Sequence, residues 1–192
     1  MLEARHITKL KLAPARLVAH KEMPPPACST KALTSHFAAV GEAVIASLMN
    51  IDPTAFQMQL LAAREHGVSF LAEDAHRNTI GISASTSLIK SGDLLQKNLI
   101  IPRDFTQAKP QLDDHLVIGV FLRGHPEPGR LPTANEVEVA GWIDQPGVRK
   151  WGVRQLPPTF KSKLPVVMVP CRQLYPLPEL LARFKKQTTV CV

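Results

Sequence analysis

Residues 80–87 read IGISASTS, and this short run decides how the middle of the chain folds. Ile80 and Ile82 alternate with small or polar residues, and a period of two predicts a β-strand with one buried face. Ser83 and Ser85 belong to the opposite face, because residues two apart in a strand point the same way. The run therefore predicts a strand with an apolar face and a row of hydroxyls on the other.

This strand forms the second arm of a predicted hairpin. Its first arm is residues 68–72, and the polar segment between them is a turn. Residues 115–122, HLVIGVFL, are almost all apolar, so we expect a central strand buried on both faces. Residues 136–143, EVEVAGWI, alternate charged and apolar side chains, so we expect one face to meet solvent. Further strands are predicted at 98–101 and within 165–170.

Helices are predicted on both sides of these strands. The first spans residues 34–49, with Thr34 or Ser35 as its cap. A second begins at Asp52, with Pro53 in its first turn, and ends at Gly67. The apolar face of the first helix is Phe37, Val40, Val44 and Leu48, and a short closing helix at 178–186 directs Leu180, Leu181 and Phe184 to the core.

These elements predict an α/β fold in a single domain, with a central mixed β-sheet flanked by helices. The domain spans residues 32–192, and residues 1–31 form a basic arm that contains three consecutive prolines. A chain of 192 residues, 45% hydrophobic and 20% charged, has the composition of one folded domain.

Composition also narrows the setting in which the protein works. No apolar run approaches the ~18 residues of a membrane span, and the basic N-terminus lacks the apolar segment of a signal peptide. The three cysteines are far apart and form no C-x-x-C pair, so neither a disulfide framework nor a zinc site is expected. We therefore expect a cytoplasmic protein with no membrane partner.

Positive charge is concentrated in two parts of the chain, which has a net charge of +7. Residues 145–178 contain six Lys or Arg and no acid, and the arm contributes further cations. A clustered excess of this kind favours a polyanionic partner, DNA before RNA. Trp151 lies between two of these cations and either stacks on a base or covers the core. The candidate nucleic-acid-binding residues are Lys9, Lys11, Arg16, Lys21, Arg149, Lys150, Trp151, Arg154, Lys161 and Lys163.

The order of segments resembles the restriction-endonuclease-like (PD-(D/E)XK) nuclease superfamily, with its (D/E)-x-K signature. The resemblance runs from about Phe37 to Phe184. It includes the helix AVGEAVIASL, the hairpin GVSFLAEDAHRNTIGISAST, the strand segments NLIIP and DDHLVIGVFLRG, the Gly-Trp of VEVAGWI and the ending VPCRQLYPLPELLARF. It implies a restriction-endonuclease-like fold.

The resemblance also implies an active site that has lost its charges. Such enzymes bind Mg²⁺ through acids on the two hairpin strands and use a nearby Lys. In this chain those positions fall on Ser69, Ser83 and Ser85, and only Glu42 on the helix keeps a matching carboxylate. We therefore expect the three serine side chains to lie on adjacent strands, on the same face as Glu42. A serine hydroxyl lacks the negative charge that concentrates Mg²⁺. The expected protein is then a non-catalytic nucleic-acid-binding protein with a degenerate site and no cofactor, a subunit or accessory of a larger bacterial or phage machine.

Three alternatives stay open at this point. The serines are simply the polar face of a hairpin, with no history of catalysis. A rebuilt site uses Glu42, Asp74 and Lys90, which makes the protein an Mg²⁺-dependent endonuclease. A protein–protein adaptor uses the basic C-terminal half to dock a partner chain.

Overall fold

The computed structural model describes residues 8–9, 30–49, 63, 66–74, 76–107, 111–124, 132–133, 136–155 and 165–184. For residues 8–9 and 30–36 it describes the backbone alone. Most of the predicted arm and nearly all of the helix predicted from Asp52 lie outside the described residues. Within them the fold is α/β, as the sequence predicts.

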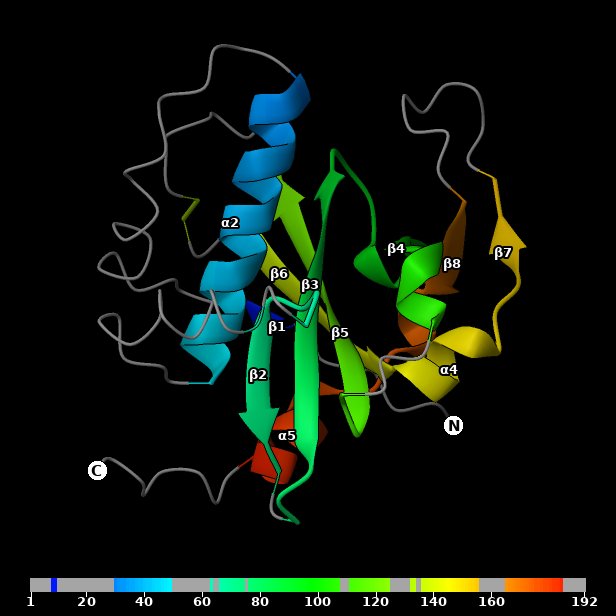
Figure 1. The fold of residues 1–192 in the computed structure, drawn as a ribbon. Coiled ribbons are helices and arrows are strands. Elements are labelled where there is room, and N and C mark those ends of the chain that lie inside the picture. Colours follow the sequence, from blue (N-terminus) through cyan, green and yellow to red (C-terminus); the bar gives the residue numbers. More distant parts are fainter. Residues whose placement is uncertain are drawn as a thin grey trace, which may run out of the picture.

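A five-stranded mixed sheet forms the centre of the molecule, in the order β1-β6-β5-β3-β2 (Figure 1). The predicted hairpin is confirmed, because β2 (Phe70–Glu73) pairs antiparallel with β3 (Thr79–Ile89). β3 then runs parallel to β5 (Asp114–Arg123) over ten residue pairs. β6 (Val137–Asp144) lies antiparallel to β5, and β1 (Thr8–Lys9) adds an edge strand from within the predicted arm.

A second sheet of three antiparallel strands departs from the prediction of one central sheet. It has the order β4-β8-β7 and contains β4 (Asn98–Pro102), β8 (Val166–Pro170) and β7 (Val153–Arg154). The strands predicted at 98–101 and 165–170 therefore exist, but they pair with each other. Pairing between segments nearly seventy residues apart follows from tertiary packing, which local alternation does not encode.

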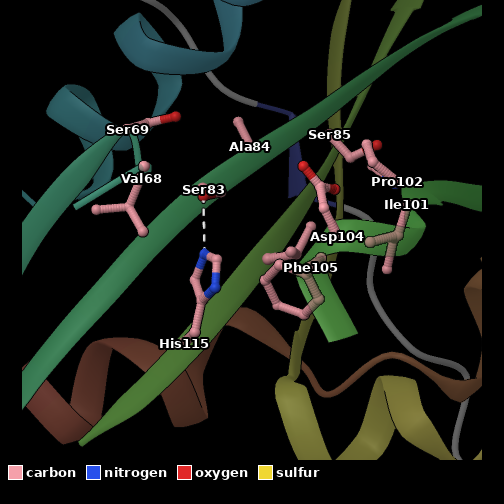
Figure 2. Close-up of a pocket in the computed structure, with 12 residues that line it drawn as sticks. Val68, Ser69, Ser83, Ala84, Ser85, Ile101, Pro102, Asp104, Phe105 and His115 are labelled. Atoms are coloured by element: carbon pink, nitrogen blue, oxygen red, sulfur yellow. Dashed lines mark hydrogen bonds between the residues drawn. The ribbon is translucent and has the colours of Figure 1, made fainter. Parts of the chain in front are cut away.

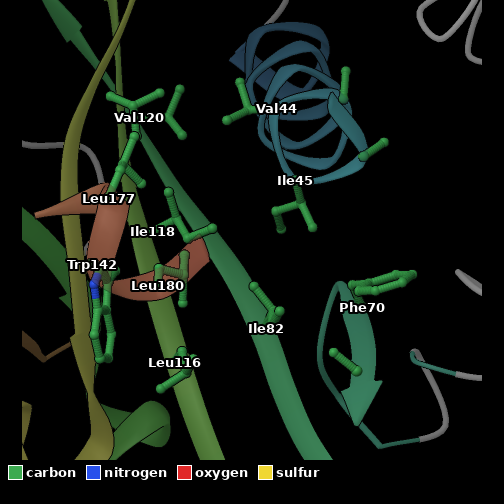
Figure 3. Packing of buried hydrophobic residues seen from close by; sticks show 14 of the residues in the cluster. Val44, Ile45, Phe70, Ile82, Leu116, Ile118, Val120, Trp142, Leu177 and Leu180 are labelled. Atoms are coloured by element: carbon green, nitrogen blue, oxygen red, sulfur yellow. The ribbon is translucent and has the colours of Figure 1, made fainter. Parts of the chain in front are cut away.

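The two faces of the central sheet carry separate hydrophobic cores. One face packs against α2 (Thr30–Leu48) and α5 (Leu177–Phe184), as Figure 3 shows for Val44, Ile45 and Leu180. The other face packs against the small sheet through residues such as Val117 and Leu99. Figure 1 shows α2 on one side of β3 and the strands β4 and β8 on the other. The layers are thus helices, central sheet and small sheet.

The helix boundaries differ from the predicted ones at two points. α2 begins at Thr30, so Thr34 and Ser35 lie inside the helix and the predicted cap is wrong. The predicted apolar face is confirmed, since Val40 and Val44 are buried and Phe37 and Leu48 pack against them. In α5, Leu180 and Phe184 are buried, whereas Leu181 remains partly exposed.

The prediction that β6 exposes one face to solvent is wrong. Glu138 is only 4% exposed, and its carboxylate pairs with the Arg123 guanidinium at 2.7 Å. Arg123 lies on the neighbouring strand β5, so the ion pair bridges two paired strands. The alternating pattern predicts that Glu138 faces solvent. The opposite charge of Arg123 on the neighbouring strand compensates the cost of burying the carboxylate instead.

Gly141 and Trp142 join the end of β6 to the segment before α5. Gly141 has φ +136°, and a Cβ there would lie 2.3 Å from the carbonyl oxygen of Tyr175. The amides and carbonyls of Trp142 and Tyr175 bond to each other at 3.0 and 2.8 Å, and the two rings lie 4.9 Å apart. Gly141 is thus required by the close approach of the Tyr175 backbone, and Trp142 packs its ring against the Tyr175 ring.

Among the described helices, none combines the length and the apolar character needed to cross a bilayer.

Candidate functional site

Ser69, Ser83 and Ser85 line one pocket of about 360 Å³, which opens where β3 and β5 meet β4 (Figure 2). Ser69 directly precedes β2, and its amide donates to the Ile82 carbonyl at 3.0 Å, which holds it beside β3. The three serines therefore line one pocket from neighbouring segments, and Ser83 and Ser85 share a face of β3 as the alternation predicts. The pocket is closed on its far side by the short turn η2 (Arg103–Thr106).

Glu42 does not join the serines. It lies on α2, and a Cβ on its neighbour Gly41 would sit 2.8 Å from the Thr86 hydroxyl. Thr86 alternates with Ser83 and Ser85 along β3, so the helix covers the opposite face of the sheet from the pocket. The expectation that Glu42 shares a face with these serines is not met.

The closest polar contact in the pocket joins Ser83 to His115. The Ser83 hydroxyl and the His115 Nε2 are 3.0 Å apart, and a dashed line marks this hydrogen bond in Figure 2. His115 lies on β5, is only 4% exposed, and has its ring 4.1 Å from that of Phe105 at a tilt of 51°. A buried imidazole is thus held between a hydroxyl and an aromatic ring.

Ser85 connects the two sheets. Its hydroxyl donates to the Ile100 carbonyl of β4 at 2.7 Å. Because the hydroxyl uses its hydrogen in this bond, its oxygen lone pairs remain the groups with which it could meet a ligand. Ser85 therefore holds β3 to β4 through the Ile100 carbonyl and also lines the pocket.

The outer wall, η2, is held by the short helix α4 (Gln145–Arg149). The Gln145 side chain donates to the Phe105 carbonyl at 2.9 Å, and the Arg149 Nε donates to the Thr106 carbonyl at 3.0 Å. Val148 of α4 is fully buried in the core between the sheets. The basic segment and the pocket wall are consequently parts of one packed unit.

The donor set of the pocket does not fit a metal ion. Asp104 brings its carboxylate to the lining, and Ser69, Ser83 and Ser85 contribute neutral hydroxyls. Within the described residues, no group of three or more His, Cys, Asp or Glu could hold a metal. Mg²⁺ is bound in proteins mainly through carboxylates and substrate phosphates, so these residues would bind it poorly.

The residues of the hypothetical rebuilt site do not meet. The Asp74 carboxylate lies in the hairpin turn and accepts bonds from the amides of His76 and Asn78 at 2.8 and 3.0 Å. Lys90 follows the other end of β3 and is exposed. An eleven-residue strand separates them by roughly 30 Å. Glu42 lies on α2, where its neighbour Gly41 packs on the middle of β3 at Ala84 and Thr86. Glu42 therefore cannot join Asp74 and Lys90 at the two ends of that strand.

The candidate cations that the structure describes are solvent-facing. Arg149, Lys150 and Arg154 are all exposed, and Trp151 between them packs against the core that joins the two sheets. Trp151 therefore covers the core, the more ordinary of its two predicted roles. Lys9 lies on the edge strand β1, where only the backbone is described. Lys11, Arg16, Lys21, Lys161 and Lys163 lie outside the described residues.

Sequence reasoning missed His115, Phe105 and Asp104 as pocket residues. The available signal for His115 was its position at the start of an otherwise apolar strand. Its spacing from the other histidines does not match a metal site, so metal-ligand spacing alone did not single it out. Phe105 and Asp104 come from a turn whose position depends on contacts with α4, so the local pattern around them carried no such signal.

No protein-family model, curated protein or solved structure matches this chain.

Proposed function

We propose that this chain is a non-catalytic nucleic-acid-binding protein with a degenerate restriction-endonuclease-like fold. The proposal places DNA before RNA as the partner and places the protein within a larger nucleic-acid machine. It rests most directly on one observation, the exposure of Arg149, Lys150 and Arg154 along a segment that contains no acid.

The local structure supports a fixed presentation of these cations. Asp144 caps α4 by accepting from the Gly147 amide at 2.8 Å, and Val148 anchors the helix in the core. Arg149 and Lys150 therefore project from the end of a packed helix, and Arg154 projects from β7, which pairs with β8. Fixed cations bind phosphates with less loss of conformational entropy than mobile ones.

The position of the serines supports the nuclease-like part of the proposal. Ser69, Ser83 and Ser85 occupy the three positions at which the resemblance expects two acids and a lysine, and they line one pocket. Their grouping is what an ancestral active site would leave after its charged side chains were replaced. The hydroxyls that remain do not suit metal-assisted hydrolysis, in which bound Mg²⁺ stabilises the charge of the transition state.

Binding is tested by fluorescence anisotropy with a labelled DNA duplex at low salt. The informative variant is Lys150→Ala/Arg154→Ala, because the structure describes no side-chain hydrogen bond or ion pair for either residue, and Ala keeps their backbone contacts. Arg149 is left in place, since its side chain holds α4 to η2. We expect the double variant to bind roughly tenfold or more weakly, because two phosphate contacts and their counterion release are lost.

The matched control removes the same charge elsewhere. Arg77→Asn/Lys90→Ala changes two exposed cations outside the basic segment, and Asn tolerates the positive φ of 64° at Arg77. This control should bind as the wild type does. Equal weakening in both variants would make the effect one of net charge alone and would contradict a binding surface on α4 and β7.

The endonuclease alternative has its own test. Purified wild-type protein should leave plasmid DNA intact with Mg²⁺ or Mn²⁺. Reproducible cleavage that disappears in Glu42→Gln or Asp74→Asn would overturn the non-catalytic assignment. If the protein instead shows no affinity for nucleic acid, the adaptor alternative gains support, with the half-exposed Val153 of β7 as its apolar contact point.

A further inference from the structure

The serine pocket has the size of a site for a small ligand. Its volume of about 360 Å³ lies near the lower end of the range for ligand pockets, roughly 300–1,000 Å³. It also contains His115, a polar side chain that is only 4% exposed and hydrogen-bonded to Ser83 within the pocket. A concave site with convergent polar groups is a candidate binding site.

The charge of the lining limits the chemistry of the ligand. Among the residues that the structure describes, no Lys or Arg lines the pocket, and Asp104 contributes a carboxylate. A phosphate group would lack the charge-assisted hydrogen bonds from cations that normally hold it. Asp104 is the one carboxylate residue among the described lining residues, and a lone carboxylate holds a divalent cation poorly. The lining therefore disfavours an anionic ligand and a metal ion, while the Asp104 carboxylate is an acceptor for a ligand N–H.

The hydrogen-bonding groups indicate what that ligand presents. A hydroxyl both donates and accepts, so Ser83 keeps bonding capacity beyond its contact with His115. The Ser85 oxygen, whose hydrogen is used by the Ile100 carbonyl, is an acceptor for a ligand donor. The pocket thus meets a ligand edge that carries donors and acceptors side by side.

The apolar part of the lining meets flat ligand faces. Val68, Ile101, Phe105 and Val117 surround the polar row, as the labelled side chains of Figure 2 show in part. A planar ring with a polar edge buries its faces against such walls while its edge bonds to the hydroxyls. Nucleobases combine these two properties, and proteins read an unstacked base by hydrogen bonds to its edge and by apolar contact with its faces.

We infer that the pocket around Ser83 and His115 binds a neutral nitrogen heterocycle of the nucleobase class. The inference rests on the proposed function for its biological context, because a bound nucleic acid would supply an unpaired base. A free nucleoside has the same chemistry, so the two sources are separated by experiment.

The test is a titration of the full chain with each of the four 2′-deoxynucleosides and with a single-stranded deoxyoligonucleotide. Binding is followed by calorimetry and by the ¹⁵N-detected signals of the His115 ring. We expect at least one nucleoside to bind saturably and to shift the His115 signals. Ser83→Ala should weaken that binding roughly fivefold, the effect of one lost hydrogen bond. Mg²⁺ and inorganic phosphate, titrated alone, should not shift them.

Two further variants keep the test specific. Ser87→Ala makes the same change on the same face of β3 outside the pocket lining, and it should bind as the wild type does. Ser69→Phe fills the pocket from its partly exposed wall, and it should abolish nucleoside binding. Thermal unfolding of each variant verifies that it is folded.

The inference is overturned if no nucleoside binds the folded wild type, if Ser87→Ala weakens binding as much as Ser83→Ala, or if phosphate binds in place of nucleosides. Duplex affinity that depends on Lys150 and Arg154, without any nucleoside binding, would leave the proposed function standing and remove the pocket inference. Nucleoside binding without affinity for any nucleic acid would support a free-nucleoside site and remove the proposed function.

Discussion

Asp74 illustrates how a single residue in the hairpin turn is held in place. Burial disfavours its charged form, but hydrogen bonds from the Asn78 side chain and the amides of Asn78 and His76, with the Arg183 guanidinium nearby, lower the pKa of Asp74 below its ordinary value. The carboxylate is thus an acceptor that organises the turn between β2 and β3. A group in this position has a structural role and a pH dependence of its own.

The Asp74→Asn variant should show this dependence. A lowered pKa in the folded state means that the stabilisation is fully present above the pKa of the unfolded chain, about 3.9. It is lost as the pH falls through the folded-state pKa. We therefore expect Asp74→Asn to be less stable than wild type at pH 7, and the gap to narrow below about pH 4.

Urea denaturation of wild type and variant across this pH range measures the gap. Glu73→Gln controls for removal of a negative charge from the same hairpin. A gap that stays constant from neutral to acid pH would contradict the account of Asp74.

At the scale of elements, the contact between α2 and β3 is unusually close at Gly41. A Cβ at this position would lie 2.7 Å from the Ala84 Cβ and 2.8 Å from the Thr86 hydroxyl. Neither atom is the end of a long flexible side chain, so the helix would have to move away from the strand. Gly41 therefore sets the distance between the helical layer and the central sheet.

Gly41→Ala should destabilise the protein although Ala is the better helix former. Ala improves helix propensity by up to about 1 kcal/mol, whereas overpacking a tight contact costs typically about 1–3 kcal/mol. We expect a net loss of roughly 1–2 kcal/mol in the free energy of unfolding. Gly152→Ala is the matched control, because no atom lies within 4 Å of its added methyl group. A Gly41→Ala variant as stable as wild type would show that α2 packs more loosely than the structure has it.

The elements that the sequence predicted correctly are those whose boundaries and buried faces depend on the pattern of their own residues. The hairpin of β2 and β3, the buried strand β5 and the apolar face of α2 all follow from the alternation or the helical spacing of their own residues. The burial of Glu138 did not follow, because its partner Arg123 lies on the neighbouring strand. The start of α2 at Thr30 was not predicted either. Cross-strand pairing supplies a partner that no local window contains.

At the scale of the whole molecule, the layers decide which candidate residues meet. Alternation predicted that Ser83 and Ser85 share a face, and they do. It did not predict that α2 covers the opposite face or that a second sheet covers theirs. Those assignments depend on long-range packing, and they separate Glu42 from the serines while bringing His115 and η2 to them.

The same layers place the basic segment behind one wall of the serine pocket. α4 packs on η2 through Gln145 and Arg149, and β7 pairs with β8 at the edge of the small sheet. The exposed cations Lys150 and Arg154 therefore belong to the layer that also closes the pocket. This arrangement supports the proposal that the molecule binds a polyanion.

The most direct test of that claim is the salt dependence of affinity for duplex DNA. Each phosphate contact contributes a log–log slope of about −0.9. From the six cations of residues 145–178 and those of the arm we expect roughly four to six contacts, and therefore a slope of about −3.6 to −5.4 for the wild type. Lys150→Ala/Arg154→Ala should flatten the slope by about 1.8, while Arg77→Asn/Lys90→Ala should leave it unchanged. Affinity that is insensitive to salt, or a double variant with the wild-type slope, would contradict the account.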